Sequence, residues 1–130
     1  MSDKNTPNTI RCKRAYDEAS ENDGYRVLVD RIWPRGIRKE TLALDSWEKD
    51  LAPSNKLRKW FNHDPQLWAG FYQKYFDELK KRQRTIDKLL DDCGGRRLTL
   101  VYSAKDTEYN NAMALKKFLE TYLTDNQRES

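Results

Sequence analysis

The sequence predicts a single α/β domain in which helices flank a small sheet. Strand-like apolar runs at residues 25–32 and 96–103 are separated by a long stretch of helical periodicity, and another helical pattern follows the second run. No internal repeat and no break in composition indicates a second domain. We expect the domain to cover residues 9–123, with flexible termini at residues 1–8 and 124–130, which are polar and unpatterned.

Three strands are predicted in the first part of the chain. Residues 9–16 alternate between polar and apolar side chains, and residues 25–32 contain an apolar run typical of a strand that is covered on both faces. The link from Asp17 to Gly24 has eight residues, fewer than a parallel crossover usually needs, and taken alone it favours an antiparallel hairpin. Residues 45–51 are predicted to form a short third strand.

Helical patterns dominate the middle of the chain. Ser54 is the expected N-cap of a helix that continues to Phe61. Asp64 and Pro65 form a second start signal, because Asp64 can cap and Pro65 can occupy the first helical position. A wide apolar stripe at helical spacing then continues to Leu79.

The last third of the chain predicts a helix, a strand and a final helix. The helical pattern continues through residues 80–92 and ends at Gly94, where a left-handed stop is expected. Residues 96–103 form the best strand candidate, and Thr107 then begins a helix that continues to Leu123. The long central helices therefore serve as a crossover to the last strand, which permits parallel pairing.

Composition and charge narrow the classes of function. No apolar stretch resembles a secretory signal or spans a bilayer, so we expect a cytoplasmic protein with no membrane partner. Cys12, Cys93 and His63 are too few for a zinc site of Cys and His ligands, and a magnesium site has no motif, so no metal site is predicted. A net charge of +4 and a pI near 9.0 fit an acidic small ligand, a nucleic acid or no charged partner.

Charged and polar residues follow the predicted strands. In an open α/β sheet, ligands bind beyond the carboxyl ends of parallel strands, where strand tips, loops and helix amino ends converge. If the strands are parallel, these side chains meet at one rim. The candidate ligand-binding residues are Arg31, Trp33 and Arg35 after the second strand, Lys49 in the third, and Lys105 and Asn110 after the last.

Anion recognition is the chemistry that this pattern favours. An arginine offers a bidentate fork to phosphate or carboxylate, and a helix amino end adds free amide donors. Asp30 and Asp106 are the candidate catalytic residues, because either can orient the cations, accept a hydrogen bond from a ligand hydroxyl or act as a general base. An ion pair between Asp30 and Arg31 or Arg35 that merely finishes a strand is an equally good interpretation. Lys105 and Asp106 are also typical of a turn and a cap.

Other motifs are weak or absent. Two adjacent asparagines, Asn110 and Asn111, are poor helix formers, which predicts that at least one of them makes a specific hydrogen bond through its amide. His63 is better interpreted as part of a helix start than as a base, and Ser103 lacks the neighbours of a catalytic nucleophile. The five glycines have neither P-loop nor dinucleotide-fingerprint spacing.

Four stretches of the chain resemble one protein family. YRVLVDRIWPRG, LALDSWEKDLAPS, LRKWFNHDP and LTLVYSAKDTEYNNAMALKKFL are similar, in order and spacing, to the YeaO-like branch of the domain of unknown function 488 over roughly residues 9–120. The resemblance implies a compact bacterial or archaeal α/β domain with a small, mainly parallel sheet of about four strands. It implies parallel pairing despite the short link, because the wider family has a helix where this branch has a loop. It carries over no reaction, so cofactors stay unknown.

The chain also departs from the wider family. That family carries a cysteine and a Cys-His-Arg-like run near the last strand, where this chain has Tyr102 to Asp106 and Tyr109 to Asn111. Thiol chemistry therefore does not transfer, because neither cysteine of this chain is in that place. The positions that match as pattern are Asp30, Arg31, Trp33, Pro34, Arg35, Gly36, Asp45, Lys49, Asp50, His63, Asp64, Lys105, Asp106 and Asn110.

Three functions fit these patterns. The first is a site for a small phosphate- or carboxylate-bearing molecule, with or without catalysis, and it requires the polar ends of the second and last strands to meet. The second is a nucleic-acid-binding accessory domain, which the basic residues between 80 and 88 and at 96–97 favour, although interspersed acidic residues dilute their field. The third is a protein-interaction module that uses surplus aromatic residues. The sequence does not predict an oligomeric state.

Overall fold

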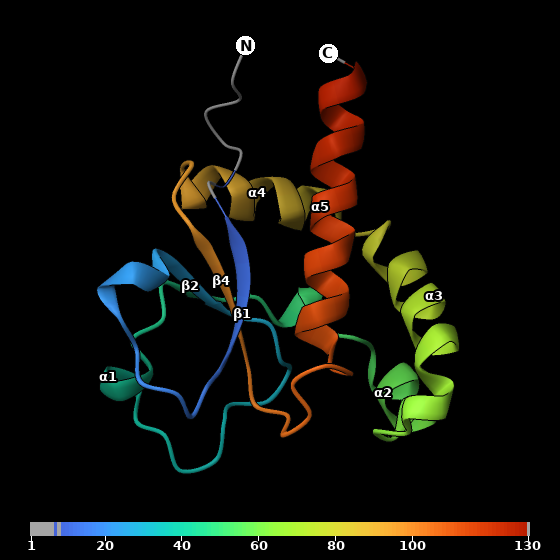
Figure 1. Cartoon of the computed structure of the whole chain (residues 1–130), viewed down its shortest axis with the longest axis horizontal. Coiled ribbons are helices and arrows are strands. Elements are labelled where there is room, and N and C mark those ends of the chain that lie inside the picture. The colour runs from blue at the N-terminus through green and yellow to red at the C-terminus, as the bar shows by residue number, and fades with distance from the viewer. Residues whose placement is uncertain (1–6, 8, 130) are drawn as a thin grey trace.

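All four strands of the sheet run parallel. The computed structural model describes residues 7 and 9–129, and its strand order is β1-β4-β2-β3. This confirms the α/β class and the mainly parallel sheet (Figure 1). The strands are β1 (Ile10–Arg14), β2 (Tyr25–Leu28), β3 (Ser46–Trp47) and β4 (Leu98–Tyr102).

The antiparallel hairpin that the short link favours is wrong. β1 and β2 do not pair, because β4 lies between them and is parallel to both. Residues 15–24, ten in all, connect the end of β1 to the start of β2. A five-residue strand is about 17 Å long and two strand spacings add about 10 Å. Ten extended residues span up to about 33 Å, so the connection returns and crosses β4 without an α-helix, with only a 3-10 turn at Glu21–Asp23.

Helices form most of the rest of the chain. The short α1 was not predicted, and residues 80–82 separate α3 from α4 where the sequence pattern runs on. The predicted strand at residues 45–51 is wrong in extent, because its second half is a 3-10 turn at Lys49–Leu51. The helices are α1 (Lys39–Leu42), α2 (Asn55–Phe61), α3 (Trp68–Leu79), α4 (Gln83–Cys93) and α5 (Asn111–Glu129).

The predicted helix starts are partly confirmed. The Ser54 hydroxyl accepts a hydrogen bond from the backbone N–H of Leu57, as an N-cap does. Asp64 caps in the same way, but it begins a 3-10 turn at Pro65–Leu67 that leads into α3. The last helix begins at Asn111 and not at Thr107, because residues 107–110 form a bend.

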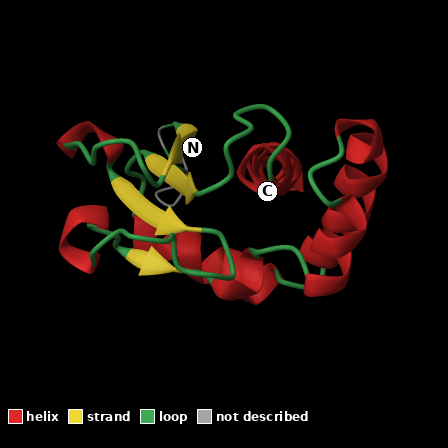
Figure 2. Ribbon diagram, turned by 90° about the horizontal axis from the view of Figure 1, so that it is seen from below, coloured by secondary structure: helices red, strands yellow, loops and turns green. Residues whose placement is uncertain are grey.

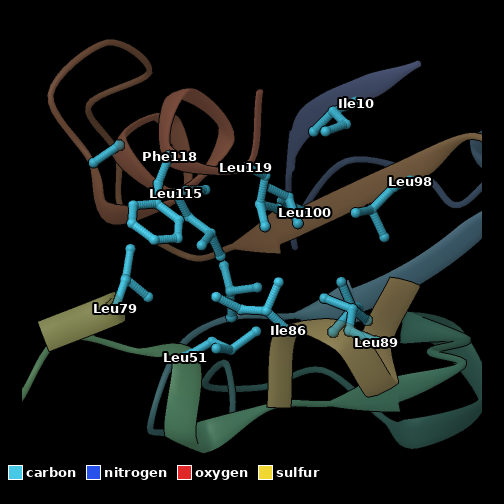
Figure 3. Close-up of a cluster of buried hydrophobic side chains, with 14 of the residues drawn as sticks. Ile10, Leu51, Leu79, Ile86, Leu89, Leu98, Leu100, Leu115, Phe118 and Leu119 are labelled. Atoms are coloured by element: carbon cyan, nitrogen blue, oxygen red, sulfur yellow. The ribbon is translucent and has the colours of Figure 1, made fainter. Parts of the chain in front are cut away.

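Apolar side chains cover both faces of the sheet. Alternate residues of β4 divide between them, since Leu98 and Leu100 join the larger cluster and Val101 the smaller. The larger cluster packs against α2 to α5, and the smaller packs against α1 and the loop after β2. Figure 3 shows side chains of α4 and α5 meeting over the sheet; its labelled residues are Ile10, Leu51, Leu79, Ile86, Leu89, Leu98, Leu100, Leu115, Phe118 and Leu119.

A buried carboxylate secures the amino ends of the strands. Asp23 is 1% exposed and accepts hydrogen bonds from Lys13 Nζ and from Arg26 Nη1 at 2.7 Å, while Thr99 donates to its carbonyl oxygen. Burial raises the pKa of Asp23, but the hydrogen bonds from Lys13, Ser20 and Arg26 outweigh it and leave the pKa below its ordinary value. No sequence pattern predicted this cluster.

The structure bears on two expectations about the chain as a whole. Among the described residues, no helix is both long enough and apolar enough to cross a membrane. The predicted flexible N-terminal segment falls almost entirely outside the described residues, and α5 extends past the predicted limit at Leu123.

Candidate functional site

A hollow of about 370 Å³ lies at the carboxyl ends of the strands. The loops after β2 and β4 and the start of α5 meet at one end of the molecule, where α2 also lies (Figure 1). Figure 2 views this end and shows α5 end-on between the sheet and α3. The hollow is lined by Tyr16, Asp30, Arg31, Ile32, Trp33, Pro34, Arg35, Ala52, Pro53, Arg58, His63, Ser103, Ala104 and Asn111.

Asp30 joins the ends of β2, β4 and α5. Its Oδ2 accepts hydrogen bonds from the backbone N–H and the hydroxyl of Ser103, at 2.9 and 2.8 Å. Its Oδ1 accepts from Asn111 Nδ2 at 3.1 Å, and the same amide donates to Val29 O. Three donors directed at one carboxylate fix its position, so the carboxylate organises the floor of the hollow.

Two tryptophans hold the loop after β2. Trp33 Nε1 donates to Ile37 O at 2.8 Å, and Trp47 Nε1 donates to the backbone oxygen of Asp30 at 2.7 Å. The two indole rings meet edge to face with centroids 5.4 Å apart. From the turn after β1, the Tyr16 hydroxyl donates to Arg35 O at 3.0 Å. The loop is therefore tied at both ends, and it presents its arginines from a fixed backbone.

Three arginines of the hollow lack carboxylate partners. Within the described residues, no ion pair involves Arg31, Arg35 or Arg58. Arg31 Nε is buried and has no hydrogen-bond acceptor. Buried donors in proteins are nearly always satisfied, so an unmatched one indicates a position where an acceptor from water or a ligand belongs. Asp30 is the one carboxylate in the lining, so the hollow has a net positive charge.

The remaining predicted site residues do not join this hollow. Lys49 lies over the ring of Trp47, with Nζ 4.1 Å from the centroid, and Lys105 is exposed outside the lining. Asp106 Oδ1 accepts hydrogen bonds from the backbone N–H groups of Tyr109 and Glu108, and these bonds hold the pKa of Asp106 below its ordinary value. Asp106 is thus placed as a turn residue.

The two asparagines make the specific hydrogen bonds that their sequence position predicts. Asn110 is 3% exposed; its Oδ1 accepts from Met113 N, which caps α5, and its Nδ2 donates to Asp106 O. Asn111 points the other way, toward Asp30. The prediction that at least one asparagine amide is used is confirmed. The neighbour that reaches the site is Asn111, whereas the sequence analysis placed Asn110 there.

Several residues of the hollow were not among the candidate ligand-binding residues. Ser103 and Asn111 follow the last strand and were expected at the same rim, but neither was named as a ligand-binding residue. His63 was interpreted as a helix start; it sits beyond α2 with a φ of 55°. Arg58 lies on α2 with no local signal at all. Only the packing of α2 against the strand ends brings the last two into the lining.

The chemistry available in the hollow comes from its guanidinium groups, its imidazole and one fixed carboxylate. Guanidinium groups suit a phosphate or carboxylate group, whether free or part of a cofactor. Among the described residues, no group of three or more His, Cys, Asp or Glu side chains is placed to hold a metal ion.

Fold and hollow together define an α/β domain with an arginine-rich pocket at the ends of its parallel strands. The chain belongs to the DUF488 family: residues 9–130 match DUF488-N3i, described as the inactive DUF488-N3 subclade. It is 46% identical over 112 residues to Uncharacterized protein YeaO of Escherichia coli (strain K12), which covers 86% of this chain and 97% of that protein. These findings confirm the resemblance to the YeaO-like branch.

Mycobacterial proteins match a shorter part of the chain. Uncharacterized protein Rv3073c of Mycobacterium tuberculosis and Uncharacterized protein Mb3100c of Mycobacterium bovis are each 47% identical over 70 residues. The matched part covers 54% of this chain and 59% of each of those proteins. No solved structure shows significant similarity to this chain.

Proposed function

We propose that this protein binds a small molecule through a phosphate or carboxylate group in the hollow at the strand ends. The observation that carries the proposal is Arg31, whose buried Nε has no acceptor, beside Arg35 and Arg58, which have no ion-pair partner among the described residues. Guanidinium groups without carboxylate partners are available to an anion. The volume of about 370 Å³ falls in the range of small-molecule sites.

We propose binding without a chemical step. A general base needs a free lone pair directed at its substrate, and hydrogen bonds from Ser103 and Asn111 take up three of the about four acceptor positions of the Asp30 carboxylate. Asp106 is engaged with backbone amides outside the hollow. The description of the matching subclade as inactive supports the same interpretation. The bacterial relatives and the sequence pattern support a bacterial, cytoplasmic setting for this binding.

Thermal unfolding with a panel of anions tests the proposal. Inorganic phosphate, pyrophosphate, sugar phosphates and organic acids are added to the wild type, to Arg35→Gln and to Arg38→Gln. At about 100 times its Kd, a bound ligand stabilises the folded state by about 2.7 kcal/mol. Arg35→Gln should abolish most of this gain, whereas Arg38→Gln, an exposed arginine of the same loop outside the lining, should retain it.

Two results would overturn the proposal. One is that no anion stabilises the wild type. The other is that both arginine variants lose the effect equally, because the loss would then follow net charge and not the hollow. Arg35 suits this test because its guanidinium forms no ion pair among the described residues, and its backbone oxygen, which accepts from Tyr16, is unaffected by the substitution.

A further inference from the structure

The hollow at the strand ends is the first of three that adjoin one another. A second hollow of about 290 Å³ lies between the loop after β2 and the end of α3, and a third of about 510 Å³ lies at the α3–α4 connection. Arg31 and Ala52 line both the first and the second hollow. Lys81 and Arg82 line both the second and the third. The three hollows therefore lie next to one another, and together we call them the basic groove.

The positive charge of the protein is concentrated in this groove. Its lining holds seven lysines and arginines against three acidic residues, which are Asp30, Asp50 and Glu78. The rest of the chain then carries 18 basic and 18 acidic residues and is neutral, so the groove accounts for the whole net charge of +4. The basic residues of the groove are Arg31, Arg35, Arg58, Lys80, Lys81, Arg82 and Arg84.

Most of these cations are not neutralised by neighbouring carboxylates. Lys80 forms an ion pair with Asp77 at 3.6 Å, but none of the other six does so among the described residues. Glu78, inside the groove, forms no ion pair among the described residues and accepts hydrogen bonds from the backbone N–H and the hydroxyl of Ser54, at 2.9 and 2.6 Å. A row of unpaired cations suits a ligand with several negative charges along its length.

Aromatic surface lies at one end of the same groove. Tyr16 lines the first hollow and is 48% exposed, and its hydroxyl is fixed by the bond to Arg35 O. Trp33 lines the same hollow. Proteins that bind single-stranded nucleic acid combine a positive groove along the backbone with aromatic side chains on which bases stack.

We propose that the anion of the first hollow is a phosphate of a short single strand of RNA or DNA. The backbone of the strand continues past Arg31 through the second hollow to Lys81 and Arg82, and a base stacks on Tyr16. This inference rests on the proposed function and deepens it, because it assigns the anionic group to a nucleic-acid chain. It also gives a role to the basic residues after α3. Anion binding in the first hollow alone does not involve them.

The test is the salt dependence of oligonucleotide binding. Fluorescence anisotropy measures the binding of labelled single strands of about 12 nucleotides, both DNA and RNA, over a series of KCl concentrations. Each phosphate contact to a single strand contributes about 0.7 to the slope of log K against log salt. Lys81→Gln/Arg82→Gln should therefore reduce the slope by about 1.4. The matched pair Lys39→Gln/Lys117→Gln, two exposed lysines outside the groove, should leave it unchanged.

Competition and small anions separate this inference from the proposed function. If pyrophosphate stabilises the wild type and oligonucleotides bind no more tightly than pyrophosphate, the inference fails and the anion site stands. An equal loss of slope in both double variants would mean that the nucleic-acid strand does not follow the groove. Displacement of the oligonucleotide by a polyphosphate of the same charge at equal concentration overturns the assignment to nucleic acid. The inference is supported if Lys81→Gln/Arg82→Gln still binds pyrophosphate but binds the oligonucleotide more weakly.

Discussion

The hydrogen bonds of Asp30 distinguish between the roles that its sequence position allows. The sequence places an acid at the end of a strand and leaves open whether it is a base, an ion-pair partner or a structural acceptor. The structure gives Asp30 three donors from Ser103 and Asn111, which come from distant parts of the chain. These donors could not be predicted, because residue spacing does not say which neighbouring strand end lies within 3 Å of the carboxylate.

We expect Asp30→Ala to be strongly destabilising. The change leaves a backbone N–H, a hydroxyl and an amide of the hollow without their acceptor, and the free energy of unfolding should fall by about 2 kcal/mol. Ser103→Ala removes only one donor and should cost about half as much. Urea unfolding followed by tryptophan fluorescence measures both. Unchanged stability in Asp30→Ala would mean that Asp30 is not a structural acceptor, and Asp30 would again be a candidate catalytic residue.

Asp23 predicts how stability depends on pH. Its pKa in the folded state lies below the ordinary value of 3.8, so its contribution to stability is present above that value and is lost as pH falls through the folded-state pKa. The free energy of unfolding should therefore decrease below about pH 4. Asp23→Asn should cost about 3 kcal/mol near neutral pH, because Arg26 is buried beside it, and should flatten the acid limb. If the free energy of unfolding of this variant falls with decreasing pH as steeply as that of the wild type, Asp23 is not the group responsible.

Among the elements, the long periodic ones were predicted and the short ones were not. β4 and helices α2 to α5 have apolar patterns that extend over whole elements, so their class was evident. α1 has only Lys39–Leu42, too short to show a period. The start of α5 was misplaced because Asp106 resembles a cap in sequence, whereas in the fold it caps a turn and Asn110 caps the helix. Arg58 and His63 were missed because their place depends on how α2 packs.

The end of α1 offers a stabilising substitution. Ala43 ends the helix with a φ of 49°, in the left-handed region that favours glycine. We expect Ala43→Gly to raise the free energy of unfolding by about 1 kcal/mol. Asn62 ends α2 with a φ of 46° and is the matched control, because asparagine tolerates this conformation and Asn62→Gly should gain less. Thermal unfolding of both variants measures the difference; an equal gain would mean that strain at Ala43 is not the cause.

On the scale of the whole molecule, we expect residues 9–123 to unfold as one unit. Both apolar clusters pack against the same sheet, and β4 contributes to each, so neither face can lose its packing alone. Urea unfolding by tryptophan fluorescence and by far-ultraviolet circular dichroism should give coincident curves. Separate transitions for the two probes would show that the α1 side or the α3–α4 side opens independently.

The position of β4 also has a consequence for synthesis on the ribosome. Among the described residues, β4 is the last strand to be made, it is one of the two inner strands of the sheet, and β1 has no partner until β4 inserts beside it. A nascent chain that has reached only the end of α4 therefore exposes β1 as an unpaired strand, together with the apolar side chains that pack against β4 in the folded protein. Closure must join segments almost ninety residues apart, as in Ile10 and Leu98, and such distant pairing is slow. Chaperone demand should peak before β4 is available to pair with β1.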